Sequence, residues 1–129
     1  AGFRTMILIC MGSALFTDVA LVLSSRPEVY GQIDISRMLG QIVAGIGFLG
    51  AGSIMKNYVG DRRQVEGLTT AAAIWLIAAV GVFIGLGIYV EAVIATIVAA
   101  IVLFVFGRYE LGLVGSVNSI KRKVISKRK

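Results

Sequence analysis

The uncharged stretch MLGQIVAGIGFLGAGSIM, residues 38–55, decides the fold of this chain. It has eighteen residues, five of them glycine, and as a helix rising about 1.5 Å per residue it covers most of a hydrocarbon core of about 30 Å. At about 100° per residue, one face gathers small residues, which are Gly40, Ala44, Gly45, Gly47, Ala51 and Gly52. Phe48 and Met55 interrupt that face. Small residues let helices approach closely in a bilayer, so we expect this segment, Gly50 included, to pack at the centre of a helical bundle.

The same stretch contains a glycine pattern that also occurs in nucleotide-binding proteins. Residues 45–50 read GIGFLG and match G-x-G-x-x-G, which in a dinucleotide site follows a strand, opens a helix and precedes an acid by about 20 residues. Glu66 lies near that offset. However, residues 67–107 are 41 residues with Glu91 as their only charge, and no soluble nucleotide-binding fold of this size could expose such a run. Helix packing is therefore the better interpretation of these glycines.

The composition indicates an integral membrane protein and excludes several kinds of chemistry. Hydrophobic residues make up 57% of the 129 positions, and the chain has one proline and no histidine. Without histidine there can be no Ser-His-Asp, Cys-His or His-metal site. Cys10, the single cysteine, cannot form a disulfide within the chain. We expect a protein that is not an enzyme and holds no cofactor, and the composition leaves a metal site undecided.

Four apolar segments satisfy the length rule for membrane spans, and they are residues 6–23, 38–55, 68–86 and 88–106. The last two must form a helical hairpin, with its turn near Gly85 and Gly87. The predicted fold class is therefore all-α: a polytopic bundle of four transmembrane spans, followed by a basic amphipathic C-terminal helix. We assign residues 1–107 to the transmembrane domain and residues 108–129 to the tail.

The basic residues are distributed unequally between the two sides of the membrane. Four spans place both ends on one side, together with eleven basic residues, whereas only Arg26 and Arg37 lie on the other side. This asymmetry predicts that the N-terminus, the loop between the second and third spans and the tail are cytoplasmic. Within the tail, helical spacing of apolar residues and six basic residues predict a helix on anionic lipid headgroups; the basic residues are Lys121, Arg122, Lys123, Lys127, Arg128 and Lys129. No aromatic interleaving accompanies them, so we expect no nucleic-acid partner.

Two acidic residues fall within the apolar segments. Asp18 follows Thr17 in the first segment, where it is either an ion or proton contact or an acid near the outer headgroups reached by water. Glu91 is in the first turn of the fourth segment, where a negative charge suits a helix N-terminus. Together with Glu28 and Asp34 these acids could form a weak Mg²⁺ site, or they could merely avoid the basic face.

The entry to the third span has the features of a structural loop. Gly67 allows a turn, and Thr69 or Thr70 is suited to capping the free N–H groups of the following helix. Further along, Gly81 and Gly85 are four residues apart, a spacing typical of close helix packing.

Several sequence blocks resemble one known family. These blocks are AGFRT at residues 1–5, GIGFLGAGSIMK at 45–56, VEGLTTAAAIW at 65–75 and GLGIY at 85–89. Together they closely resemble the transmembrane domain of the MgtC/SapB family over about residues 1–110. The motif residues carried by this resemblance are Arg4, Thr5, Glu66, Gly67, Thr69 and Thr70. Family members usually have one more helix upstream and, in the longer ones, a soluble C-terminal domain, so we expect a cropped chain without those parts.

The resemblance implies a bacterial inner-membrane protein, in a family connected with growth in low magnesium and survival inside host cells. Its members are not established enzymes or magnesium transporters, and the type member is connected with modulation of the F-type ATP synthase. We therefore interpret the chain as a non-enzymatic regulator that forms oligomers or binds another membrane protein through its glycine-rich helices. The alternative is an oligomeric ion pathway or transporter subunit that uses Asp18 and Glu91.

Overall fold

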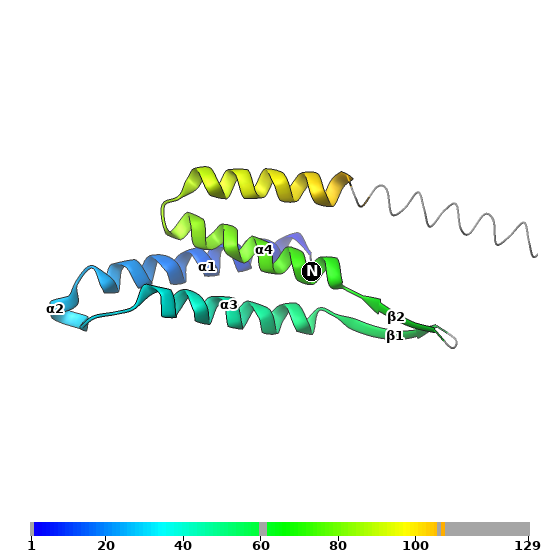
Figure 1. The fold of residues 1–129 in the computed structure, drawn as a ribbon, viewed down its shortest axis with the longest axis horizontal. Coiled ribbons are helices and arrows are strands. Elements are labelled where there is room, and N and C mark those ends of the chain that lie inside the picture. The colour runs from blue at the N-terminus through cyan, green and yellow to red at the C-terminus, as the bar shows by residue number, and fades with distance from the viewer. Residues whose placement is uncertain (1, 60–61, 106, 108–129) are drawn as a thin grey trace, which may run out of the picture. The chain divides into compact units, whose positions relative to one another are not determined.

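The structure is a computed structural model that describes residues 2–59, 62–105 and 107. Three long apolar helices are candidate membrane spans, and they are α1 (Phe3–Ser24), α3 (Ile35–Gly52) and α4 (Leu68–Gly85). A short helix, α2 (Pro27–Tyr30), joins α1 to α3 (Figure 1). A further apolar helix, Tyr89–Val105, is shorter than the three candidate spans. The prediction of an all-α membrane fold is confirmed, and three of its four expected spans reach full length among the described residues.

The chain divides into two compact units, residues 1–96 and 97–129. The first unit contains α1 to α4 and the first turns of the helix Tyr89–Val105. The described part of the second unit is the remainder of that helix and Gly107. The predicted amphipathic tail, residues 108–129 with its six basic residues, lies outside the described residues.

Helix α3 begins three residues before the uncharged stretch, because Asp34 caps it. The Asp34 carboxylate accepts hydrogen bonds from the backbone N–H groups of Ser36 at 2.9 Å and Arg37 at 3.4 Å, and from the Ser36 hydroxyl at 2.6 Å. These bonds satisfy donors that a helix N-terminus leaves free. The hydrogen bond from the Ser36 hydroxyl is the main reason that the pKa of Asp34 lies below its usual range.

The loop between the second and third expected spans is a β-hairpin, which the sequence did not predict. Strands β1 (Met55–Val59) and β2 (Arg62–Glu66) are antiparallel, and Met55 pairs with Glu66. Because Met55 belongs to β1, the expected helix over residues 38–55 is wrong at its end, and α3 stops at Gly52. We call the end of the bundle that carries this hairpin the hairpin end, and the opposite end the α2 end (Figure 1).

Gly67 makes the junction between the hairpin and α4. It is the N-cap of α4, with φ of +89°, and no side chain caps the helix. The expectation that Thr69 or Thr70 caps it is therefore wrong, since both lie inside the first turn. A Cβ atom at Gly67 would overlap the carbonyl oxygen of Ser53, so the close approach of two chain segments at this point requires glycine.

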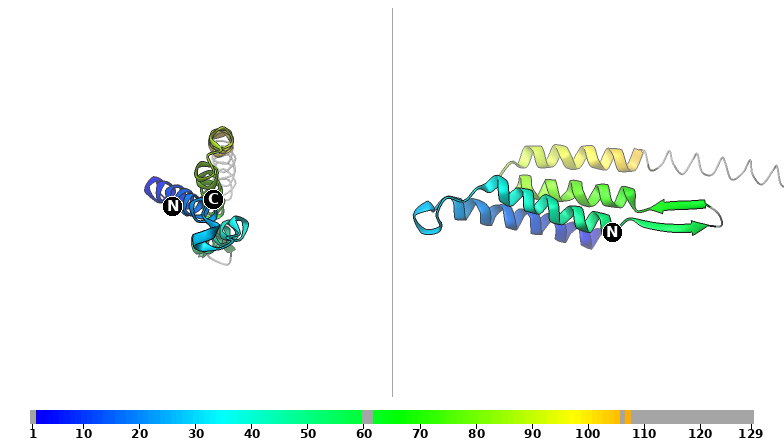
Figure 2. Two further views of the ribbon diagram at one scale, coloured as in Figure 1. Left: turned by 90° about the vertical axis from the view of Figure 1, so that its left-hand side faces the viewer. Right: turned by 60° about the horizontal axis from the view of Figure 1, so that its bottom comes forward.

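The core of the first unit lies where α4 packs against α1. Helix α4 contacts both α1 and α3, and the two views of Figure 2 show these three helices alongside one another. The fully buried Thr17 donates its hydroxyl to the Ser13 carbonyl oxygen at 2.8 Å, which satisfies a polar group that would otherwise be costly inside a bilayer. The buried residues among those described are Ser13, Thr17, Ala20, Gly50, Ile74, Ala78, Val80, Gly81 and Ala92.

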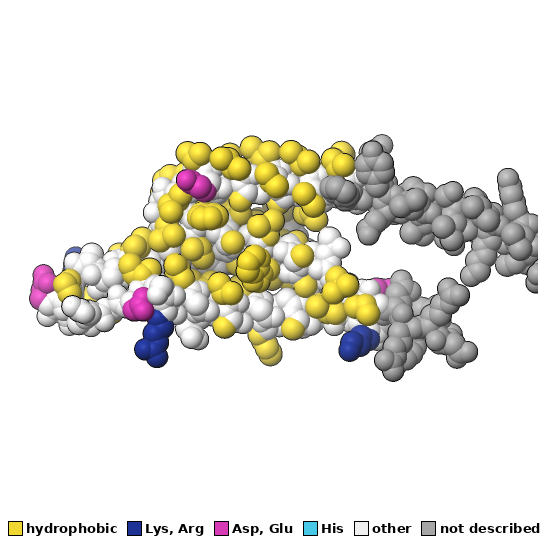
Figure 3. Space-filling view, viewed as in Figure 1, with side chains coloured by type: hydrophobic (Ala, Val, Ile, Leu, Met, Phe, Trp, Pro, Cys, Tyr) yellow, Lys and Arg dark blue, Asp and Glu magenta, His cyan; other side chains and the backbone are white. Residues whose placement is uncertain are grey.

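Helix α4 ends at a tight turn, as the sequence predicted. The N–H groups of Leu86, Gly87 and Ile88 donate to carbonyls of the last turn of α4, and Gly87 has a φ of +75°. The next helix then begins at Tyr89. In Figure 3, hydrophobic side chains cover the helices along their length on this face, and charged side chains lie mainly near the two ends. That distribution is typical of a protein whose helices lie in lipid.

Candidate functional site

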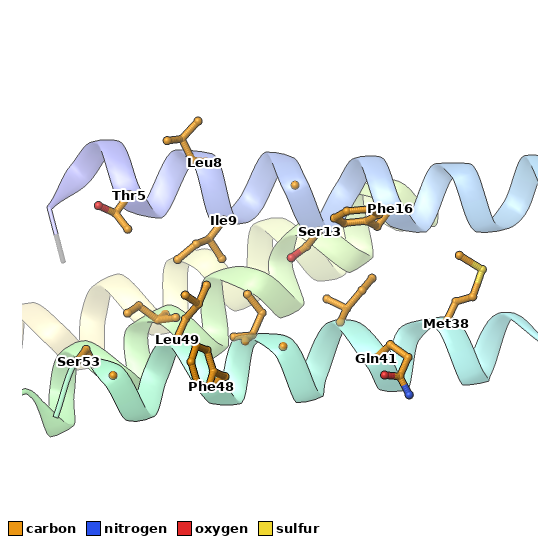
Figure 4. Close-up of a pocket in the computed structure, with 16 residues that line it drawn as sticks. Thr5, Leu8, Ile9, Ser13, Phe16, Met38, Gln41, Phe48, Leu49 and Ser53 are labelled. Atoms are coloured by element: carbon orange, nitrogen blue, oxygen red, sulfur yellow. The ribbon is translucent and has the colours of Figure 1, made fainter.

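A groove of about 910 Å³ opens between α1 and α3. Figure 4 shows side chains from both helices around it, with α4 behind. It extends from Thr5 and Ser53, near the hairpin end, to Phe16 and Met38 further toward the α2 end. Its walls are mostly apolar, and they include Leu8, Ile9, Gly12, Ile42, Gly45, Ile46, Phe48, Leu49 and Gly52, with Ile74 of α4. The groove therefore offers an elongated apolar surface that runs along the helices.

The glycines of α3 leave the space beside that helix unfilled. A Cβ atom built at Gly40, Gly45, Gly47 or Gly52 would meet no atom of another residue within 4 Å, whereas at Gly50 it would make ordinary contact with Ala71. Gly50 is the only buried residue of α3. The expectation that this segment is the centre of the bundle is therefore wrong for the single chain. Its glycine face is open.

The glycines of α4 have a different role. A Cβ atom at Gly85 would lie 2.5 Å from the carbonyl oxygen of Ala14 and 2.6 Å from the Cβ atom of Thr17, and one at Gly81 would overlap the carbonyl of Cys10. These contacts set α1 and α4 in parallel with their backbones close together, which is how small residues promote helix association in membranes. The structure thus places Gly81 and Gly85 in a formed interface, within the chain itself.

Ser13 and Gln41 are polar side chains of the groove that the sequence analysis did not predict as site residues. Ser13 is only 3% exposed, and Figure 4 shows its hydroxyl oxygen turned from α1 toward the groove. Among the described residues, no group forms a hydrogen bond with that hydroxyl. Gln41, on α3, is exposed and its amide has no hydrogen-bond partner among the described residues either. The sequence could have indicated Gln41, because it is the one amide side chain in the uncharged eighteen-residue stretch.

Asp18 and Glu91 are both exposed and belong to the α2 half of the molecule. Asp18 lines a shallow cavity of about 370 Å³ with residues of the turn after α4, including Gly85 and Tyr89, whereas Glu91 does not line it. Among the described residues, no group of three or more His, Cys, Asp or Glu side chains could hold a metal ion. The described residues therefore form no cluster of three or more such ligands, and a weak Mg²⁺ site of one or two carboxylates stays a prediction.

The depth in the membrane of the turn after α4 bears on the role of Asp18. Helix α1 continues from Thr17 to Ser24, about 10 Å past the contact with Gly85 at ~1.5 Å per residue. The turn interrupts the helical backbone between α4 and the helix that begins at Tyr89, and irregular backbone exposed to lipid is costly in the hydrocarbon region. The turn, and Asp18 beside it, are therefore best accommodated at a polar interface. This placement favours the interpretation of Asp18 as an acid near the headgroups.

The family-motif residues gather at the hairpin end. Arg4 and Thr5 lie in the first turn of α1, and Thr5 also lines the groove. Glu66 ends β2, directly before the Gly67 turn and α4, which carries Thr69 and Thr70. The family-motif residues thus surround the junction of α3, the hairpin and α4.

Comparison with known proteins decides the family. The model of the MgtC family matches residues 1–111. The chain belongs to the MgtC family. It is 43% identical over 111 residues to the protein named "Putative magnesium transporter YhiD" of Escherichia coli K12, covering 82% of this chain and 48% of that protein. No solved structure matches.

Two other relatives give the same result. Protein SrpB of Synechococcus elongatus is 40% identical over 114 residues, which cover 85% of this chain and 63% of SrpB. Protein MgtC of Brucella abortus is 45% identical over 97 residues, which cover 75% of this chain and 37% of that protein. The chain thus spans less than two thirds of each of these relatives. The MgtC-family assignment and the apolar helices together identify a membrane protein.

Proposed function

We propose that this MgtC-family chain is a non-enzymatic regulatory protein of the bacterial inner membrane, which acts by binding a transmembrane helix of another protein in the groove between α1 and α3. The observation that carries this proposal is the open glycine face of α3. Gly45 and Gly52 line the groove and have space where a Cβ atom would be. Close approach of a second backbone at such positions is a recognised source of helix association in bilayers.

The orientation that we propose places the hairpin end in the cytoplasm. Arg4 lies in the first turn of α1 and Lys56 lies in β1 at that end, and the predicted tail adds six further basic residues. Arg26 and Arg37 are the basic residues toward the α2 end. The excess of positive charge at the hairpin end supports a cytoplasmic location, and the tail would then meet anionic lipid headgroups.

The partner that the family resemblance suggests is the F-type ATP synthase, in bacteria adapting to low magnesium. The test uses inverted inner-membrane vesicles from cells that lack the chromosomal copy, with ATP-driven proton pumping as the readout. Expression of the chain should change the pumping rate, and Gly45→Leu should abolish that change because a leucine fills the groove wall. Val43→Leu is the matched control, since Val43 does not line the groove. Equal pumping with and without the chain would contradict this choice of partner.

A photo-reactive amino acid at Phe48 tests partner binding without assuming which protein is bound. Phe48 lines the groove and is 81% exposed, so a probe there would touch whatever helix enters. We expect a cross-linked membrane protein that disappears in the Gly45→Leu background and is absent with the probe at Val43. Identical adducts from Phe48 and Val43 would contradict docking in the groove.

The second candidate function is ion movement, and the cavity beside Asp18 is the observation in its favour. The name of YhiD suggests magnesium transport, so the alternative function is tested as transport of Mg²⁺. Proteoliposomes containing a magnesium-sensitive dye distinguish the two functions. Under the regulatory proposal, Mg²⁺ entry equals that of empty liposomes. Entry that depends on the chain and is lost in Asp18→Asn would support the transporter instead.

A further inference from the structure

Helix α3 is the candidate span least suited to face lipid and also the least covered by its own chain. Its mean hydropathy is 1.3, compared with 2.2 for α1 and 2.1 for α4, and only 6% of the span is buried. By contrast, 22% of the more apolar α4 is buried. A span of this composition gains little from lipid contact, because its glycines expose backbone and its one amide has no partner in hydrocarbon. Protein is therefore a better cover for this face than acyl chains are.

The hydroxyl of Ser13, which is accessible from the groove although the residue as a whole is buried, points to the same conclusion independently of the glycines. Ser13 is on α1, at the opposite wall of the groove from Gly45, and it is more than nine-tenths buried. Its hydroxyl faces the groove without a hydrogen-bond partner among the described residues (Figure 4). An acyl chain has no group that could satisfy it, whereas a helix can offer a side-chain acceptor or a backbone carbonyl.

We propose that a second copy of this chain occupies the groove, with the two α3 helices crossing about a two-fold axis normal to the membrane. This inference rests on the proposed function, because it names the occupant of the same groove. A two-fold interface must be self-complementary, and the α3 face meets that requirement. Its groove-lining residues are uncharged, since Arg37 does not line the groove. It has open glycine positions into which Phe48 of the other copy can project, and its only amide is self-complementary.

The amide of Gln41 is the strongest argument for a second copy over an unrelated helix. A primary amide carries both an acceptor oxygen and two donor hydrogens. Two glutamines related by a two-fold axis can therefore satisfy each other without any other group. A different partner would have to supply a matching polar side chain at that depth. In the dimer, a target helix would have to displace the second copy, so the dimer and the target complex are mutually exclusive.

The first test is disulfide cross-linking of the full chain in lipid bilayers. The background is Cys10→Ala, which removes the only native thiol. Gly45→Cys should give a dimer-sized species on mild oxidation, because Gly45 faces the second copy. Val43→Cys is the control, since Val43 is about half exposed and lies outside the groove. Cross-linking of Val43→Cys to an equal extent, or none for Gly45→Cys, would overturn the proposal.

The second test measures association without a cross-link. Copies labelled with donor and acceptor dyes are reconstituted in vesicles over a range of protein-to-lipid ratios, and energy transfer reports the dimer. We expect Gly45→Leu and Gln41→Leu each to weaken dimerisation by about tenfold, in line with a helix contact of roughly 1.4 kcal/mol. Ser13→Ala should weaken it by a smaller factor. Thermal unfolding in detergent shows whether each variant still folds.

The outcomes separate this inference from the proposed function. Energy transfer that stays at the random-mixing level at every protein-to-lipid ratio, or dimerisation unchanged by Gly45→Leu, would overturn the dimer. Neither result would affect the Phe48 photo-cross-linking to another protein in native membranes. Conversely, a dimer in pure vesicles together with no adduct to another protein would contradict the regulatory proposal alone.

Discussion

Two glycine-bearing helices of this molecule use their small residues in opposite ways. On α4, Gly81 and Gly85 lie so close to α1 that a Cβ atom would overlap it or lie within 2.6 Å of its atoms. On α3, a Cβ atom added at Gly40, Gly45, Gly47 or Gly52 would meet nothing within 4 Å apart from chain neighbours and the backbone of its own helix. Both helices show the same sequence signal for close packing, but Gly81 and Gly85 of α4 pack tightly against α1, whereas Gly50 is the one α3 glycine in contact with another helix of the chain. Glycines in a span therefore indicate a close approach without saying whether the neighbour belongs to the same chain.

The largest effect that separates the two faces should come from leucine at Gly81. We expect Gly81→Leu to destabilise the folded chain by about 3 kcal/mol or to prevent folding, because the side chain would force α1 and α4 apart. Gly45→Leu should leave the unfolding transition of the monomer unchanged or slightly raised, since it improves helix propensity in open space. Unfolding by a denaturing detergent, followed by helical content at a dilution that keeps the chain monomeric, provides the measurement. Equal losses from both variants would remove the distinction between the faces.

The next effect should come from the junction that fixes α3 relative to α4. Gly67 has φ of +89° and touches the carbonyl of Ser53, so Gly67→Ala combines an unfavourable conformation with an overlap. We expect a loss of about 1–3 kcal/mol. Gly87→Ala shares the positive φ but has open space, so it serves as the control for conformation alone. A loss at Gly67 no larger than at Gly87 would show that the contact with Ser53 contributes nothing.

A smaller effect should come from the hydrogen bond inside the α1–α4 interface. Thr17→Val keeps the shape of the side chain and removes the bond to the Ser13 carbonyl. Polar contacts in membrane proteins average about 0.6 kcal/mol, so a loss of that order is expected. Thr96→Val is a useful comparison, since Thr96 makes the same kind of bond to Ala92 and is only partly buried. A loss at Thr17 smaller than at Thr96 would argue against the importance of the interface.

The sequence predicted the approximate positions of the three long helices and of the shorter apolar helix Tyr89–Val105, because hydrophobic length is a strong signal. It located the turn at Gly87 for the same reason, since the run from Gly67 to Gly107 is too long for one span. It did not predict the hairpin, because β1 and β2 are short and mix charged, polar and apolar residues. Their pairing depends on α3 and α4 bringing the strand ends together at Gly67, which no local pattern records.

The candidate site could be predicted only in part. Helical periodicity predicted one small-residue face on α3, whereas Gly45 and Gly52 line the groove and Gly40 and Gly47 do not. It also could not tell that α4 would pack against Gly50 and leave the other glycines open. The partner of a face is set by the bundle, and the bundle is set by contacts such as Gly85 against Ala14. The sequence indicated Asp18 as a candidate because an acid in an apolar segment is costly. It could not predict that Asp18 lies beside the turn after α4, because the packing of the helices brings the two together.

The smallest expected effect concerns the cap at the start of α3, where the open face begins. The pKa of Asp34 lies below its usual range, chiefly because the Ser36 hydroxyl donates to the carboxylate. A lowered folded-state pKa means that the cap stabilises the fold fully above the unfolded pKa and that this contribution is lost as pH falls through the folded value. An NMR titration of the Ser36 amide should therefore have a midpoint below that of an ordinary aspartate. Ser36→Ala should raise the midpoint, and Asp34→Asn should abolish the titration while keeping a capping oxygen. A midpoint unchanged by Ser36→Ala would show that the hydroxyl is not the cause, and the start of α3 would then owe its position to the backbone bonds alone.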